Sequence, residues 1–156
     1  MGTQQIFMVI VSVLIVGLAI AVAISSTDNM AVTTNRSSVT GDLVGIYGRA
    51  MEYWLTPASH GGGGRESWSP DGAQELGPWL GYEGYQKDGD AHIFSTGNGS
   101  YHITIEDDNT LTVIGSGNEI GYDPSYASSG AGEHGQLEYR MVIDPHQSNY
   151  QIELLN

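Results

Sequence analysis

The chain has 156 residues, a formal net charge of −13 and no cysteine, which excludes disulfides and thiol chemistry. The acidity disfavours binding to nucleic acid or to an anionic membrane surface, because the protein would repel phosphate. All charged residues lie at or after Asp28, so the remaining polar, Gly-rich part, of about 130 residues, is long enough for one small domain with a modest core.

The first predicted element begins with 19 consecutive residues, 6–24, that contain neither charge nor proline. A cleaved signal peptide would start with Lys or Arg, whereas no basic residue precedes Arg36. About 20 apolar residues span a bilayer, and a core helix of a soluble protein is rarely apolar all round. We therefore expect this segment to lie in a membrane or in an equally apolar protein environment. Its length does not distinguish the two.

Helical spacing of apolar residues continues beyond residue 30. The residues on this face are Val32, Val39, Leu43, Ile46, Tyr47, Ala50, Met51 and Trp54. The pattern stops at Pro57, which cannot continue a helix. The sequence thus predicts one helix over about 3–55, with 25–29 as a candidate kink. Its first half is wholly apolar, and its second half is amphipathic.

The rest of the chain indicates β-structure. Residues 60–72 are expected to form a loop with four consecutive glycines, read as flexible, and 72–92 shows little periodicity. Candidate strands are 91–96, 100–106, 110–117, 137–144 and 149–156, with a long polar loop over 117–136. We predict an α+β fold with an antiparallel sheet of about four strands, one face of which packs on the amphipathic helix half. The expected division is an apolar helix half at 1–29 and a globular domain at 30–156.

Signals for chemistry are weak. The five histidines show no metal-ligand spacing, and the glycine run lacks the Lys-Ser/Thr of a phosphate loop. No catalytic constellation can be assembled, so we expect no enzyme, no cofactor and no bound metal. The stretches 87–92 and 106–109 could offer oxygens to Ca²⁺, but ordinary turns are the favoured reading. Asn35 and Asn98 each begin an N-glycosylation sequon, a pattern that is common by chance.

Trp68 and Trp79 lie in Gly/Pro-rich sequence and are predicted to make contacts between subunits.

The apolar stretch "QQIFMVIVSVLIVGLAIAVAIS", its amphipathic continuation and a small C-terminal sheet together resemble the type IV pilins and their relatives. The stretch "YGRAMEYWLTPASHGGGG" is similar to a group of bacterial pilin-like proteins, in which an aromatic helix end and a proline precede a run of glycines. The resemblance covers the architecture of the whole chain, and at motif level it is confined to about residues 1–64.

This resemblance implies a structural role as the major subunit of an extracellular, cell-surface filament. The partners would be identical copies of the chain and, before polymerisation, the inner membrane and the pilus assembly machinery, with no nucleic acid. The residues expected in the filament core are Ile6, Phe7, Val9, Ile10, Val13, Leu14, Ile15, Gly17, Leu18, Ile20 and Ile24. The residues expected to pack the helix on the sheet are Val39, Leu43, Ile46, Tyr47, Ala50 and Trp54.

The chain also departs from the family. Most type IV pilins have Glu at the fifth mature position, which is thought to pair with a neighbouring N-terminal amine. If Met1 is the mature end, that position is Gln5, whose amide can still contact the amine but without charge assistance. If Met1 is instead the initiator, the leader would be unusually short. The family's common C-terminal cysteine pair is absent.

Two alternative functions stay open at this point. One is a membrane-anchored, exported domain that binds or senses something. The other is a minor pilin or a pseudopilin of a secretion system. A simple anchor would usually carry a flexible linker after the membrane helix. Here the amphipathic part of the predicted helix begins almost directly after the apolar run, which favours the filament subunit.

Overall fold

The computed structural model describes residues 2–69, 74–88, 91–106, 110–121, 135–146 and 149–155; the side chains of 119–121, 135–137 and 149 are excepted. Two compact units make up the chain, Met1–Thr34 and Asn35–Asn156. The first unit is helical from Thr3 onwards. The second contains the remainder of the long helix and all of the sheet.

The long helix α1 runs from Thr3 to Leu55 without interruption, as the apolar spacing predicts. The candidate kink at 25–29 is regular helix, because no proline interrupts the backbone hydrogen bonds there. Pro57 explains why the helix ends at Leu55, since the residue before a proline is disfavoured in helical geometry.

A short 3₁₀ helix, η1 (Ala58–His60), and a loop of glycines follow α1. The loop turns back over the helix end. Its backbone N–H groups at Gly63, Gly64 and Arg65 donate to the carbonyl oxygens of Tyr53, Thr56 and Trp54 at 2.8, 2.9 and 2.9 Å. Carbonyls in the last turn of a helix have no partner within the helix, so this loop caps α1. The expectation of a flexible glycine run is wrong, because Gly62 and Gly63 are buried.

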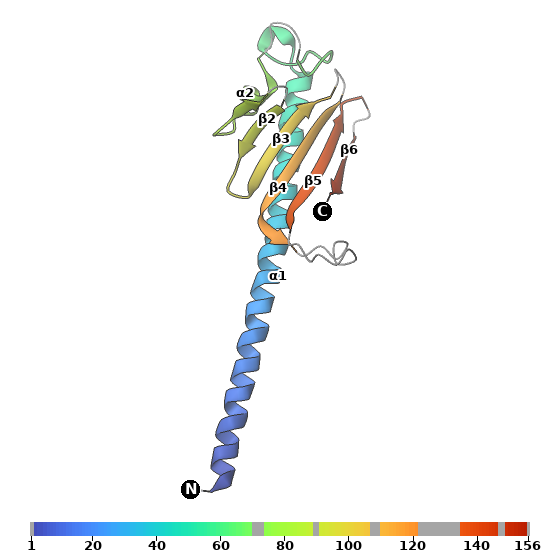
Figure 1. The fold of residues 1–156 in the computed structure, drawn as a ribbon. Helices are drawn as coiled ribbons and strands as arrows, with labels where there is room; N and C mark the ends of the chain where they lie inside the picture. The colour runs from blue at the N-terminus through green and yellow to red at the C-terminus, as the bar shows by residue number, and fades with distance from the viewer. Residues whose placement is uncertain are drawn as a thin grey trace. The chain divides into compact units, whose positions relative to one another are not determined.

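The sheet is an antiparallel meander of six strands, in the order β1-β2-β3-β4-β5-β6 (Figure 1). Their bounds are β1 Gln86–Asp88, β2 Ala91–Ser95, β3 Gly99–Ile105, β4 Leu111–Gly121, β5 Gly135–Asp144 and β6 Asn149–Leu154. All five predicted segments are strands. The expected number of about four is wrong, and β4 and β5 extend into the predicted loop 117–136.

Two elements in 72–92 have no counterpart in the prediction. Strand β1 has only three residues, all exposed, and is paired to β2 through its backbone, so it carries no apolar alternation. Helix α2 (Leu76–Leu80) contains Pro78 in its first turn, where the missing N–H is tolerated. It ends at Gly81, which takes the left-handed conformation with φ 69°.

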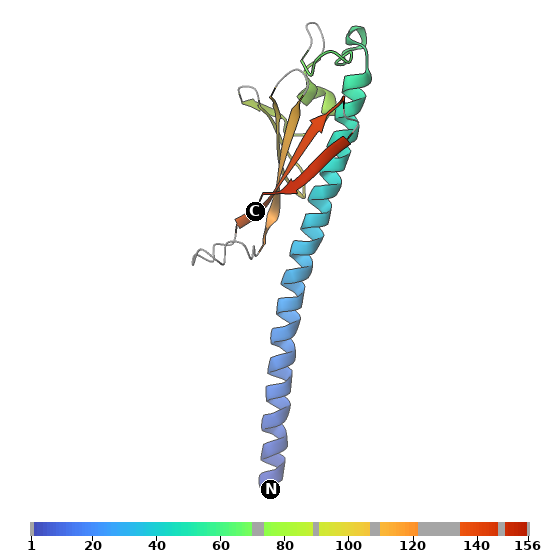
Figure 2. The ribbon, with the colours of Figure 1, turned by 90° about the vertical axis from the view of Figure 1, so that its right-hand side faces the viewer.

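The core of the second unit lies between the sheet and the 35–55 part of α1, which follows one sheet face (Figure 2). From the strands, Tyr101, Ile103, Leu111, Val113, Met141 and Ile143 are fully buried. These residues alternate along β3, β4 and β5, as expected for a sheet with one covered face. The fold class predicted from sequence, a long helix packed on an antiparallel sheet, is confirmed.

Candidate functional site

The apolar segment of α1 exposes its side chains around the whole helix. Thirteen large apolar residues between 6 and 24 are 53–69% exposed within the single chain. By its length and composition, the helix contains a stretch that is apolar enough to cross a membrane, and none of that stretch is buried within the single chain. Exposed apolar surface of this extent is rare on soluble monomers and marks an interaction with a partner or a membrane.

Every residue predicted for a filament core lies on this exposed surface. Ile6, Phe7, Val9, Ile10, Val13, Leu14, Ile15, Gly17, Leu18, Ile20 and Ile24 are all exposed. The hydroxyl of Ser12, the one polar side chain in 6–24, donates to the carbonyl oxygen of Met8 at 2.8 Å. This donor is therefore satisfied within the helix and does not require water. Gln5 is also exposed, and its backbone N–H donates to the Gly2 carbonyl at 2.9 Å.

The residues predicted to pack the helix on the sheet lie on the opposite half of α1. Val39, Leu43, Ile46 and Ala50 are fully buried, and Trp54 is 3% exposed. Tyr47 is half-buried, and its ring centroid lies 4.6 Å from that of Tyr150 on β6. These contacts fix the amphipathic half of α1 to the domain.

A polar junction joins α1 to the turn between β2 and β3. One carboxylate oxygen of Asp42, Oδ2, accepts hydrogen bonds from Thr96 Oγ1 at 3.0 Å, Asn98 Nδ2 at 3.0 Å and Tyr101 Oη at 2.7 Å. Burial and the hydrogen bond to Asp42 raise the pKa of the Tyr101 hydroxyl. Because all three donors come from the β2–β3 hairpin, the junction holds this hairpin against α1.

Both sequon asparagines belong to this junction. Asn35 lies within α1, and its Nδ2 donates to the carbonyl oxygen of Asn98 at 2.9 Å. Asn98 in turn donates a hydrogen bond from its own Nδ2 to Asp42 Oδ2. N-glycosylation modifies this nitrogen, so a glycan at either position would have to displace a hydrogen bond inside the folded domain. The folded domain therefore argues against both sequons as acceptors.

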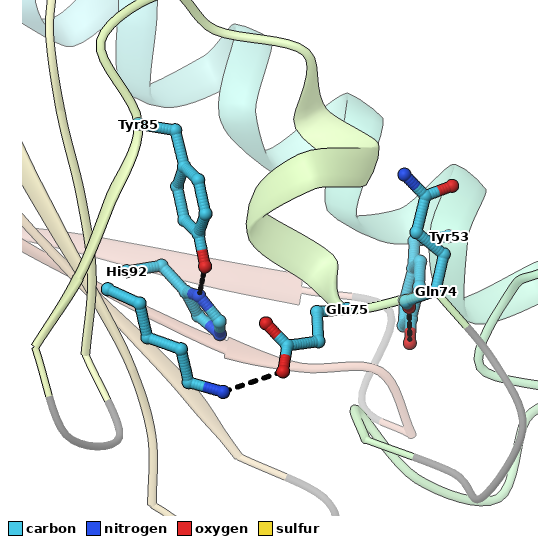
Figure 3. A network of polar contacts seen from close by, with 6 residues as sticks. Tyr53, Gln74, Glu75, Tyr85 and His92 are labelled. Carbon is cyan, nitrogen blue, oxygen red and sulfur yellow. Dashed lines mark hydrogen bonds and ion pairs between the residues drawn. The ribbon is translucent and has the colours of Figure 1, made fainter.

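A second polar cluster lies next to α2 and contains side chains of Glu75, Tyr85, Lys87 and His92 (Figure 3). His92 on β2 is 4% exposed, and its Nδ1 lies 2.8 Å from the Tyr85 hydroxyl oxygen. Lys87 Nζ donates to Glu75 Oε1 at 2.6 Å. Gly77 is tightly enclosed, since a Cβ there would lie 2.8 Å from His92 Nδ1. The cluster therefore requires a residue without a side chain in α2.

The surroundings of this cluster shift the pKa values of its groups. Burial raises the pKa of Tyr85, and so does the charge of Glu75. One hydrogen bond joins the Tyr85 hydroxyl oxygen to His92 Nδ1, and the tautomer of the ring decides which of the two groups donates. Burial lowers the pKa of His92, so its ring is neutral near pH 7.

No group of three or more potential metal-ligating side chains occurs among the residues that the structure describes. The two stretches that could offer oxygens to Ca²⁺, but are favoured as ordinary turns, include 89–90 and 107–109, which lie outside those residues. Trp68 does not form a subunit contact as predicted. It is 0% exposed and packs on Trp54, with ring centroids 4.8 Å apart. Trp79 is partly buried and meets Tyr53 edge-on.

In comparisons with known proteins, no family model, no curated protein and no solved structure matches the chain.

Proposed function

We propose that this chain is the major subunit of an extracellular filament of the type IV pilus kind, whose core consists of the 6–24 segments of many copies packed against one another. Before assembly, the inner membrane holds the same segment. The filament has a structural role, and the acidic domain of residues 35–156 forms its outer part.

One observation carries this proposal. Thirteen large apolar side chains of 6–24 are more than half exposed in the single chain. Burying one such side chain contributes about 1.5–3 kcal/mol, so the segment requires an apolar environment outside its own chain. A bilayer supplies it for a separate subunit, and identical segments of neighbouring copies supply it after assembly.

Two further features favour copies of the chain as the final partner. Gly17, Ala19, Ala21 and Ala23 leave little bulk on the helix, which permits close approach of another helix. In addition, α1 continues as helix from the apolar segment into the residues that pack the sheet. A domain that merely needs a membrane anchor gains nothing from such a continuous helix, since a flexible linker would serve it equally well.

The proposal predicts that Ile15→Asp abolishes filaments. The substitution would place an unpaired carboxylate in a dry bundle of helices, at a cost of several kcal/mol for each subunit. Ile15→Leu keeps the apolar surface and should assemble as the unchanged chain does. Electron microscopy of material sheared from the cell surface would show the difference.

A second variant separates assembly from membrane insertion, because an added Asp also disfavours insertion into a bilayer. Ala19→Phe keeps the segment apolar but adds bulk at a small position. We expect it in the membrane fraction at an unchanged level, with filaments greatly reduced. Normal filaments from both Ile15→Asp and Ala19→Phe would leave the membrane-anchored domain as the better account.

A further inference from the structure

The guanidinium of Arg36 on α1 lacks a complete set of partners. The side chain is partly buried, and its Nε atom is buried without a hydrogen-bond partner among the described residues. Buried donors without a partner are rare in folded proteins, and each requires an explanation. The lack of a carboxylate partner is unexpected in a chain that has 18 acidic residues and only five Lys and Arg side chains.

The helix itself offers Arg36 no carboxylate. Side chains three or four positions apart are neighbours on a helix, and positions 32, 33, 39 and 40 are Val, Thr, Val and Thr. Asp42, the next acidic residue of α1, already accepts three hydrogen bonds from the β2–β3 hairpin. The ion pairs found among the described residues involve other cations. A carboxylate that completes Arg36 therefore has to come from elsewhere.

Asp28 is the matching charge. It is the only charged side chain in residues 1–35, it is exposed, and it follows the apolar segment 6–24 by four residues. Positions 24, 25, 31 and 32 carry no cation, so no neighbour on the helix can neutralise it. When copies pack through 6–24, as the proposed function requires, Asp28 comes to the edge of a dry, apolar bundle. An unpaired carboxylate is unfavourable there.

The two charges cannot neutralise each other within one chain. They lie eight residues apart on one continuous helix, which separates them by about 12 Å along the helix axis and by about 80° around it. Two copies whose helices run side by side, displaced along the axis by about 12 Å, would bring Asp28 of one copy to the level of Arg36 of the other.

We propose that Arg36 of each copy forms an ion pair with Asp28 of a neighbouring copy, and that this pair sets the axial displacement between neighbours in the filament. The inference rests on the proposed function. Each copy pairs its Arg36 with one neighbour and its Asp28 with another, and a head-to-tail contact that does not close into a ring builds a filament. Apolar contacts are non-directional and leave the displacement open, whereas a guanidinium–carboxylate pair has a defined geometry.

Removal of one charge or of both distinguishes a pair from two independent charges. Asp28→Asn and Arg36→Gln each leave the other charge unpaired, and each should reduce the filaments recovered by shearing at least roughly fivefold, at equal amounts of chain in the membrane fraction. The double variant leaves no unpaired charge and should recover most of the loss, as expected for residues in contact. Asp28 is exposed and lies outside the domain, so its variant cannot act through misfolding of the domain.

Arg65→Gln is the matched control for the loss of a cation. Arg65 is exposed in the loop after α1, and its variant should assemble as the unchanged chain does. Reduced filaments from Arg65→Gln, to the same extent as from Arg36→Gln, would mean that only the net charge matters and would overturn the pair.

Cysteine cross-linking tests the contact directly, because the chain has no cysteine of its own. Asp28→Cys/Arg36→Cys lacks both charges, so it should assemble, and a short bismaleimide should link its copies into a ladder on a denaturing gel. Asp28→Asn/Arg36→Cys, with one cysteine for each copy, should give no ladder.

The outcomes separate this inference from the proposed function. Additive losses in the double variant, normal filaments from both single variants, or filaments of the two-cysteine variant that give no ladder would each overturn the ion pair and leave the filament proposal standing. Absence of filaments from the unchanged chain would overturn both.

Discussion

At the residue scale, Gly62 shows how tightly the loop after α1 is enclosed. A Cβ at this position would lie 2.7 Å from the Tyr53 carbonyl oxygen, closer than any packed methyl group can come. Gly62→Ala should therefore destabilise the domain by about 1–3 kcal/mol through overpacking. Thermal unfolding followed by near-ultraviolet circular dichroism would measure it.

Gly48→Ala is the matched control for that substitution. Gly48 lies in α1 with nothing within 4 Å of an added Cβ, so the same chemical change should stabilise the helix by up to about 1 kcal/mol. If the two variants unfold at the same temperature, the loop does not cap the helix as described.

His92 gives a pH-dependent prediction. Burial lowers its pKa in the folded chain below the ordinary value of 6.5, so the unfolded chain binds the proton more readily. The stability contributed by neutral His92 is complete above pH 6.5 and is lost as the pH falls towards the folded pKa. Glu75, Lys87 and Tyr85 surround the ring. Since the pKa of Glu75 is lowered from 4.5, mainly by its hydrogen bond to Lys87, its own contribution is lost only at more acidic pH.

Denaturant unfolding between pH 7.5 and 5.5 tests this assignment. The unchanged chain should lose stability over this range, while His92→Gln should start less stable and show a flatter dependence. A pH dependence that is identical in both chains would place the titrating group elsewhere. His102, exposed on β3, supplies the control variant His102→Gln, for which we expect the slope of the unchanged chain.

At the scale of elements, the sheet depends on the amphipathic half of α1. A fragment of residues 30–156 keeps the buried face of Val39, Leu43, Ile46 and Trp54, and should be a folded, acidic monomer. A fragment of residues 56–156 loses that face. Each large side chain contributes about 1.5–3 kcal/mol, against a total stability of about 5–15 kcal/mol for a small domain. The shorter fragment should therefore aggregate or stay unfolded.

Circular dichroism and gel filtration of both fragments distinguish the outcomes. A well-folded 56–156 fragment would mean that α1 serves only as a tether, which would favour a membrane-anchored domain over a filament subunit.

The elements that can be predicted from the sequence are those in which apolar residues recur at a regular spacing. Helix α1 and the strands β2 to β6 carry such periods, because each buries one face against a partner. Strand β1 is exposed at every residue, and α2 is short and contains Pro78, so neither has a period to detect. The prediction that Trp68 contacts other subunits is wrong, because a Gly/Pro-rich neighbourhood indicates a loop but does not indicate whether that loop is buried.

The two polar clusters lie beyond sequence reasoning for a different reason. Asp42 meets the β2–β3 turn across more than 50 residues, and His92 meets Tyr85 only because β1 folds back on β2. Nothing in the local sequence marks these pairs. The apolar segment 6–24, by contrast, is visible from composition alone, since its role depends on total apolar surface and not on a particular contact.

At the scale of the whole molecule, the chain joins an apolar segment that requires partners to an acidic domain that resists association. Only segment 6–24 combines continuous apolar surface with complete absence of charge. If the proposed function is right, self-association should proceed through that segment, and the charge of −13 should keep the domains of neighbouring filaments apart.

Electron cryo-microscopy of sheared cell-surface material, with mass spectrometry to identify its main band as this chain, tests the central claim most directly. We expect a helical filament in which segments 6–24 of neighbouring copies contact one another along the axis and no lipid separates them. A chain that is found only as separate copies in the membrane fraction, with no filament in the sheared material, would contradict the account.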